Sequence, residues 1–407
     1  MVQTPLRRFK TSSQSRTAKT PVTDKHGTKP MPSNPQYPGV YVQEAPRGVR
    51  NIAGVPTSVT AFIGTIPSGA LNQPVYLASF VEFERVFGTP TTGCEIGYSV
   101  HQFFLNGGRD AWVVRIPDHP TEAQWLGGIR ALDLVDMLSL LVLPGVTLQS
   151  PVAAAIAYCE KRRAFLILDS PREAPGPDEI RQRVERGEWT HSPNAGIYYP
   201  WLKMADPWNG GLPRLSPPSG SIAGLFARTD STRGVWKAPA GAEAALIGVV
   251  ALERQLADKE NQEINRHGIN CLRSFPLRGF VAWGSRTLAG DDRAGSEWKY
   301  IPTRRLALFV EESLYRGLKW AVFEPNDEPL WAQIRHNASE FMDGLFRQGA
   351  FQGSTPKDAY FVKCGAETTT QNDRNLGIVN IAVGFAPLKP AEFVILHVRQ
   401  MAGQTVP

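Results

Sequence analysis

The stretch 320-WAVFEPNDEPLWAQIR-335 combines two tryptophans, three carboxylates, two prolines and an asparagine, and it ends on Arg335. Its polar residues suit a helix start, because Asn and Asp cap helices and Glu and Pro favour the first turn. We therefore predict an N-cap at Asn326 or Asp327 and a helix that continues to Phe346. The buried face of this helix is then formed by Leu330, Trp331 and Ile334.

A catalytic pair of carboxylates is the alternative interpretation of the same stretch. Such a pair needs two carboxyl groups that converge on one pocket. Asp327 and Glu328 are adjacent at a helix start, where neighbouring side chains generally diverge. We therefore interpret these carboxylates as helix-capping groups.

The sequence before this stretch predicts two further helices, over 242–268 with a stop at Gly268 and over 303–324. In the second, apolar residues at helical spacing form one face. The opposite face is either solvated, with ion pairs between its side chains, or a docking surface. Its charged residues are Arg304, Arg305, Glu311, Glu312, Arg316 and Lys319.

The sequence after this stretch predicts strands, because apolar and polar residues alternate. The predicted strands cover 359–365, 376–388 and 392–400. The third is flanked by proline and lies last in the sequence, so we expect it to detach easily.

The N-terminal half predicts a mixed α/β layer of short apolar strands and helices. Residues 136–170 form a strand, a helix and a strand, which predicts a βαβ unit with a parallel pair. Residues 171–237 are rich in Pro and Gly and predict long ordered loops. The other predicted elements are strands over 57–65 and 111–116 and helices over 79–88 and 96–108.

The first 36 residues have a composition of their own. They carry seven basic residues and one acidic residue, which together equal the net charge of +6 of the whole chain. A polar, basic segment of this kind is expected to be disordered. The remainder is nearly neutral and has no nucleic-acid-binding motif, which argues against a nucleic-acid module. No apolar run is long enough to predict a membrane span.

The sequence offers little for an enzyme. Asp169 follows a predicted strand, where α/β enzymes place ligands, but no phosphate loop or nucleophile elbow accompanies it. The histidines, such as His101, His267 and His336, have no triad or metal spacing. The cysteines form no CxxC pair, so we expect reduced and buried thiols at Cys94, Cys159, Cys271 and Cys364.

The stretch from residue 320 resembles the signature of the contractile phage-tail sheath family. Other stretches agree with this resemblance, which covers nearly everything after residue 36. In the C-terminal half these are 236-WKAPAG-241, 267-HGINCLRSFPLRGFVAWGSRTL-288, 300-YIPTRRLALFVEESL-314 and 390-PAEFVILHVRQ-400. In the N-terminal half they are 37-YPGVYVQE-44, 197-IYYPW-201 and 217-PPSGSIAG-224.

The resemblance implies a two-domain fold of the α+β and α/β classes. A mixed α/β domain would cover 56–235, and a helix-rich domain would cover 236–407. Before them lie an extension over 1–36 and an extended arm over 37–55. The small sheet of the second domain would be completed by strands from neighbouring subunits.

The resemblance also implies a structural subunit, not an enzyme. Such subunits stack as helical rings, commonly six-fold, around an inner tube, and contract to drive the tube through a target envelope. The implied partners are other copies of the chain, the tube protein, and baseplate and terminal cap proteins. No cofactor, small-molecule substrate, direct nucleic-acid contact or membrane insertion is implied.

The compact length favours an extracellular injection device over the tail of a phage virion, which remains the alternative. An α/β enzyme with an unrecognised site is a more distant alternative. The resemblance implies assembly in the bacterial cytoplasm, followed by a place in a released particle or virion.

The resemblance assigns three sets of residues to assembly. Donated strands would include Tyr37, Val40 and Val42 at one end and Phe393, Val394, Leu396 and Val398 at the other. The accepting sheet would include Phe361, Val362, Val379, Ile381 and Val383. The candidates for facing the tube are Arg304, Arg305, Arg316 and Lys319.

Overall fold

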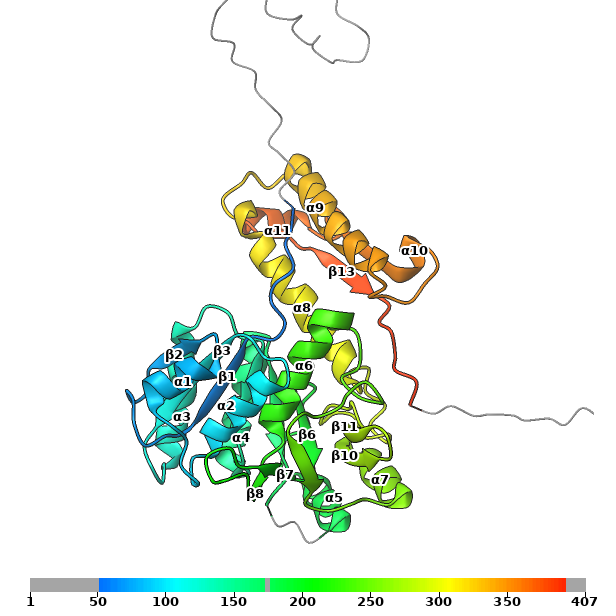
Figure 1. Cartoon of the computed structure of the whole chain (residues 1–407). Coiled ribbons are helices and arrows are strands. Elements are labelled where there is room, and N and C mark those ends of the chain that lie inside the picture. The colour runs from blue at the N-terminus through cyan, green and yellow to red at the C-terminus, as the bar shows by residue number, and fades with distance from the viewer. Residues whose placement is uncertain (1–50, 173–175, 393–407) are drawn as a thin grey trace, which may run out of the picture. The chain divides into compact units, whose positions relative to one another are not determined.

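The computed structural model describes residues 51–172 and 176–392 (Figure 1). An eight-stranded sheet has the order β11-β10-β6-β5-β4-β1-β3-β2. The strands from β10 to β3 are parallel, and antiparallel strands flank them at both edges. The strands are β1 (Thr60–Thr65), β2 (Pro74–Leu77), β3 (Ala111–Ile116), β4 (Leu140–Val142), β5 (Phe165–Asp169), β6 (Ala195–Tyr199), β10 (Ile269–Phe275) and β11 (Gly279–Ala282).

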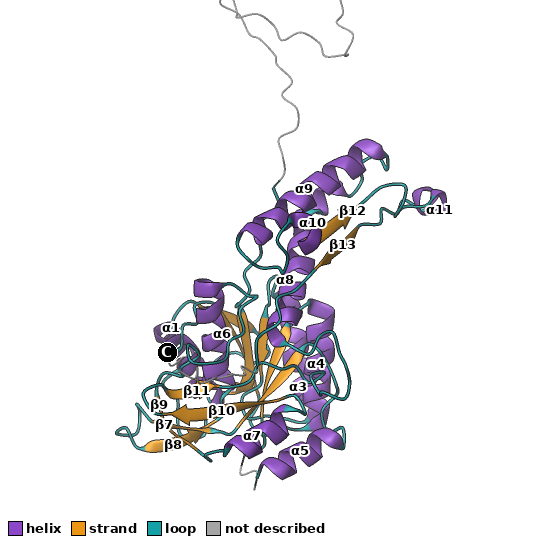
Figure 2. Ribbon diagram, turned by 90° about the vertical axis from the view of Figure 1, so that its right-hand side faces the viewer, coloured by secondary structure: helices purple, strands orange, loops and turns teal. Residues whose placement is uncertain are grey.

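Helices cover both faces of this sheet (Figure 2). Successive residues of a strand point to opposite faces, so Ala61 and Ile63 join one core cluster and Phe62 joins the other. One face is covered by α3 (Glu122–Ala131), α4 (Gln149–Arg162), α5 (Pro177–Glu185) and α7 (Asp258–Asn265). The other is covered by α1 (Phe80–Phe87), α2 (Glu95–Leu105) and α6 (Ser219–Arg233).

Two smaller sheets complete the fold. An antiparallel sheet of order β8-β7-β9 consists of β7 (Leu202–Ala205), β8 (Pro213–Ser216) and β9 (Val249–Leu252). A two-stranded antiparallel sheet consists of β12 (Tyr360–Lys363) and β13 (Ala382–Phe385). The remaining helices are η1 (Leu132–Leu134), α8 (Ile301–Gly317), η2 (Lys319–Ala321), α9 (Glu328–Arg347), α10 (Pro356–Ala359) and α11 (Gln371–Asn375).

The long helices α8 and α9 share a core that is separate from the two clusters of the large sheet. Leu306 and Val310 of α8 pack with Phe341 and Met342 of α9, and Val235 joins them. The strands β12 and β13 lie against this core through Val362 and Val383, among others.

Several predictions from the sequence are confirmed. The strand at 111–116 is β3, the pair β4–β5 is parallel, and the helix after the opening stretch is α9. Asp327 is its N-cap, since its side chain accepts the Leu330 N–H at 3.5 Å. All four cysteines are buried and free.

Two predictions are wrong. Residues 171–237 are not mainly loops, because they contain α5, β6, β7, β8 and α6. Residues 242–268 are not one helix: they contain strand β9 and the short helix α7, which ends near Gly268. The large sheet continues past residue 236 to β11, and the long helices α8 and α9 follow it.

Within the described residues, no helix is long and apolar enough to cross a membrane.

The close packing of α2 on α6 generates a stability prediction. A Cβ at Gly224 would lie 2.4 Å from the Phe103 carbonyl oxygen, so we expect Gly224→Ala to cost about 1–3 kcal/mol through overpacking. A Cβ added at Gly344 in α9 would have no atom within 4 Å apart from its chain neighbours and the backbone of its own helix, so Gly344→Ala should stabilise the fold by about 0.5–1 kcal/mol. Denaturant unfolding of both variants tests this, and two effects of the same sign would contradict it.

Candidate assembly surface

The two-stranded sheet lies with one face on the core of α8 and α9. Tyr360 and Val362 of β12 and Val383 and Phe385 of β13 pack against that core. The Tyr360 hydroxyl also donates to the Ser339 carbonyl of α9 at 3.4 Å. Strand alternation turns the residues between them outward.

Both edges of this sheet have free backbone groups. The Ala386 N–H donates to the Ala359 carbonyl at 2.8 Å, so this position, next to the Tyr360–Phe385 pair, is one at which backbone groups face the partner strand. Because such positions alternate along antiparallel strands, the N–H and C=O groups of Val362 and Val383 point away from the partner strand. No third strand of the described chain pairs with either edge. An isolated two-stranded sheet is marginally stable, and an open edge can pair with another chain.

The structure bears on the residues expected to accept a strand. Phe361, Val362 and Val383 lie in β12 and β13. Val379 and Ile381 lie outside both strands, so the strand predicted over 376–388 is wrong before Ala382. The donating residues Tyr37, Val40, Val42, Phe393, Val394, Leu396 and Val398 lie outside the described residues.

Side chains hold residues 378–380 away from a strand conformation. The Asn326 side chain donates to the Ile378 carbonyl at 3.0 Å, and the Asn380 N–H donates to Thr369 Oγ1 at 3.0 Å. Thr368 Oγ1 donates to the Asn380 carbonyl at 2.8 Å. These bonds use the backbone groups that a strand would need for its neighbour.

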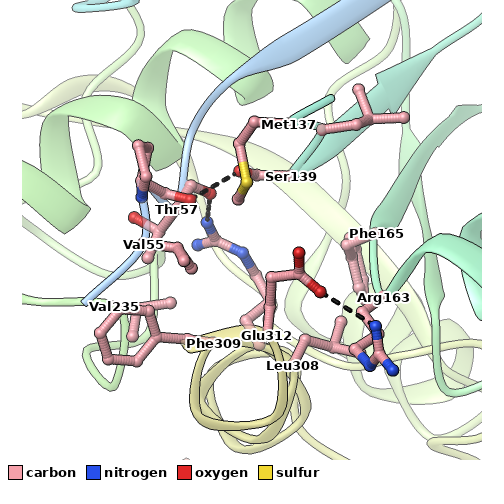
Figure 3. A pocket seen from close by; sticks show the side chains of 13 residues that line it. Val55, Thr57, Met137, Ser139, Arg163, Phe165, Val235, Leu308, Phe309 and Glu312 are labelled. Carbon is pink, nitrogen blue, oxygen red and sulfur yellow. Dashed lines mark hydrogen bonds and ion pairs between the residues drawn. The ribbon is translucent and has the colours of Figure 1, made fainter. Parts of the chain in front are cut away.

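The first described residues run antiparallel along α8. Ile52 contacts Gly317 at the end of the helix, and the Val55 N–H donates to Ser313 Oγ at 3.1 Å. Arg305, near the start of α8, donates to the Thr57 carbonyl at 2.8 Å. Figure 3 shows Val55 and Thr57 beside the α8 residues that line a narrow crevice under this segment.

A buried ion pair fixes the start of α8. Arg305 donates to both carboxylate oxygens of Asp230 in α6, at 2.9 and 2.6 Å, and the two side chains are 3% and 5% exposed. The Thr57 hydroxyl donates to the same carboxylate at 2.6 Å. The pair therefore joins α6, α8 and the segment before β1.

The other charged residues of α8 also bind groups within the chain. Arg316 donates to Glu312 at 2.6 Å and to Asp136 at 2.7 Å, and its hydrogen bond lowers the pKa of Asp136. Arg163 pairs with Glu312 at 3.0 Å (Figure 3). Arg304 donates to the Asn194 side chain at 2.9 Å.

The expected tube-facing set changes accordingly. Arg305 is buried, so its assignment to a surface is wrong. The sequence could not show this, because its partner Asp230 lies 75 positions away. Lys319 is exposed and lies near the Tyr315 ring.

Comparison with known families gives this arrangement a context. The family model described as the phage tail sheath protein central domain matches residues 118–288. The model described as the phage tail sheath C-terminal domain matches residues 293–401. Together they cover more than half of the sequence.

The chain belongs to the phage tail sheath family. One similar solved structure is the sheath of PVC, an extracellular contractile injection system, in its contracted state. Its sequence is 31% identical to this chain, and the two structures match with a TM-score of 0.76 over 90% of this chain and 98% of that chain. The contracted helical sheath of the anti-feeding prophage (AFP) is 29% identical, with a TM-score of 0.74 over 89% of this chain and 99% of that chain.

Curated relatives of the sheath family are larger. The tail sheath protein of Vibrio phage KVP40 is 34% identical over 187 residues, which are 45% of this chain and 26% of that protein. The tail sheath protein of Burkholderia phage BcepMu is 26% identical over 224 residues, or 53% of this chain and 46% of that protein. The chain therefore spans between a quarter and a half of the length of these two phage sheath proteins.

In this sheath protein, Asp169 joins two elements. Its carboxylate accepts the Gly145 N–H at 2.8 Å and both the N–H and the hydroxyl of Ser219 at 2.7 Å. Burial raises the pKa of Asp169 to about 6, against the effect of these donors. The contacts tie the end of β5 to the first residue of α6, which gives the carboxylate a structural role.

The Arg305–Asp230 pair generates a prediction about the sheath fold. Asp230→Asn removes the negative charge and leaves Arg305 buried without it, so we expect a loss of about 3–5 kcal/mol in unfolding free energy. Asp258→Asn is the matched control, because Asp258 pairs with Arg273 but is 92% exposed, and should change stability by less than about 0.5 kcal/mol. Equal losses of unfolding free energy in the two variants, measured by chemical denaturation, would contradict the stabilising role of the buried pair.

Proposed function

We propose that this chain is the sheath subunit of an extracellular contractile injection system. It polymerises as stacked rings around an inner tube and contracts to drive that tube through a target envelope. The observation that supports this most is the match to the PVC sheath, which extends over 98% of that chain. The tail sheath of a phage virion is the second candidate, supported by the partial matches to phage sheath proteins.

Strand donation links the subunits in this proposal. The segments Tyr37–Glu44 and Glu392–Gln400 add to the open edges of β12 and β13 in neighbouring copies. The outward backbone groups of Val362 and Val383 support this, because they can bond an added strand without loss of the β12–β13 pairing. One hydrogen bond contributes about 1 kcal/mol net, so several in each subunit can hold a ring together while its subunits move.

The proposed partners are the tube, a baseplate and a terminal cap, with commonly six-fold rings. A chain from the structure of the AFP baseplate is 29% identical to this one, with a TM-score of 0.73, which supports a place near a baseplate. Lys319 is the candidate for a polar tube contact, since it is exposed. In this proposal the rings form in the cytoplasm and act in a released particle.

Electron microscopy of the purified protein tests the proposed function. We expect long hollow striated cylinders from the full chain, with or without added tube and baseplate. Deletion of residues 392–407 should leave a folded monomer that forms no cylinders, because the donated strand is lost. Cylinders of normal length from the deletion variant would contradict strand donation, and a full chain that stays monomeric with tube and baseplate would contradict the sheath function.

Proline substitutions test which edge accepts the strand. Val383→Pro removes an outward N–H and no bond of the β12–β13 pair, so the monomer should fold while assembly through the β13 edge is lost. Val362→Pro is the matched variant for the β12 edge. Circular dichroism controls for folding, and pelleting measures assembly. Normal assembly by both variants would contradict an accepting role for this sheet.

A further inference from the structure

A buried arginine holds the last described residue of the chain. Arg286 lies in the loop after β11 and is fully buried. Its Nε and Nη2 atoms donate to the two carboxylate oxygens of Glu392, at 2.8 and 2.7 Å. Its Nη1 atom donates to Asp292 at 2.9 Å. The bidentate geometry fixes the position and the orientation of the Glu392 carboxylate.

Two residues next to α8 complete this cluster. The Tyr300 hydroxyl donates to Glu392 at 3.1 Å, and the Lys299 ammonium lies 2.7 Å from Asp292 and 3.8 Å from Glu392. Two cations therefore face two carboxylates, so the charges balance. Burial raises the pKa of Glu392, but hydrogen bonds from Arg286 outweigh it and the net pKa is lowered. The carboxylate is thus charged and bound at neutral pH.

The residues just before Glu392 have less support. Pro387 forms a bridge with Phe351, which is the last strand-like contact before the cluster. Residues 388–392 then line an open groove of about 770 Å³ beside Trp236 and Trp283, and do not enter a core. The position of this segment consequently depends on the carboxylate of Glu392.

The cluster also unites stretches that are far apart in the sequence. Arg286 belongs to 267–288, Tyr300 to 300–314 and Glu392 to 390–400. These three parts of the chain therefore meet at the Glu392 carboxylate.

We propose that Arg286 and Glu392 form an anchor that fixes the point at which the C-terminal segment leaves its own subunit. This inference rests on the proposed function and refines it, because the donated segment then begins at residue 393 and Glu392 stays with its own chain. The anchor connects the donated strand to the domain of the large sheet, so a pull on the strand acts on that domain and not on the small sheet.

The anchor also limits how far the donated strand can reach. Without it, residues 388–392 would be released and the reach would grow by roughly 16 Å at about 3.3 Å per residue. A longer free segment lowers the effective concentration of the strand at the accepting edge of its neighbour. Loss of the anchor should therefore weaken assembly while the accepting edge stays intact.

Glu392→Ala in the full chain tests the anchor. We expect at least a tenfold rise in the concentration needed for cylinders, with Asp258→Asn unchanged as the control for loss of an exposed carboxylate. Mixed with the unaltered protein, Glu392→Ala should shorten the cylinders, because it accepts a strand but donates one poorly. A variant that merely unfolds would not shorten them. Assembly at the original concentration would overturn the anchor.

A spin label on the monomer separates the anchor from the proposed function. Lys389 is exposed and the four native cysteines are buried, so a nitroxide on Lys389→Cys reports the mobility of the segment before Glu392. Glu392→Gln keeps the shape of the side chain and removes its charge, so it also serves if the alanine variant does not fold. We expect the rotational correlation time of the label to fall at least twofold in this variant. An unchanged correlation time overturns the anchor, whereas a more mobile label in a protein that never forms cylinders overturns only the proposed function.

Discussion

The buried ion pair between Arg305 and Asp230 is the contact on which the arrangement of the chain depends. Both charges are removed from water, and their bidentate contact and the Thr57 hydroxyl compensate for this loss. The contact exists only when α6, α8 and the segment before β1 are in place together. It therefore sets the position of α8, which in turn carries the core of α9 and the small sheet.

Helix α8 also determines where the two ends of the described chain lie. Ile52 contacts Gly317 at the last turn of the helix, whereas Glu392 bonds Tyr300, the residue before its first turn. A helix of 17 residues is about 25 Å long, so the two segments leave from points well separated along one rod. In the proposed assembly, two segments that start from separate points can reach different neighbours, as the heterologous contacts of a helical assembly require.

The sequence predicted the elements that local chemistry specifies. The cap at Asp327 and the apolar spacing after it defined α9, and apolar runs flanked by turn residues defined β1 and β3. The strand β6 was missed, because it is buried on both faces and so lacks alternation, and because Pro and Gly residues surround it. The helix expected over 242–268 failed where Gly248 takes a φ of +84° and β9 pairs with β7.

The assembly residues were harder to predict for a related reason. Spacing placed Arg305 on a charged helix face, but only the fold shows that this face meets Asp230 and the segment before β1. Nothing in the sequence singles out Arg286, because its partner Glu392 lies 106 positions away. Glu392 was also expected to belong to the donated strand. The resemblance assigned Val362 and Val383 to the sheet together with Val379 and Ile381, and the side-chain bonds that exclude the last two from the strand depend on the folded loop.

The central claim is that each subunit is joined to its neighbours through the open edges of β12 and β13. Electron cryomicroscopy of assembled cylinders, at a resolution that traces the backbone, tests it most directly by showing which chain borders this sheet. The account predicts that strands from neighbouring copies lie beside Val362 and Val383. A sheet that stays two-stranded in the cylinder, or that is completed by residues of its own chain, would contradict it.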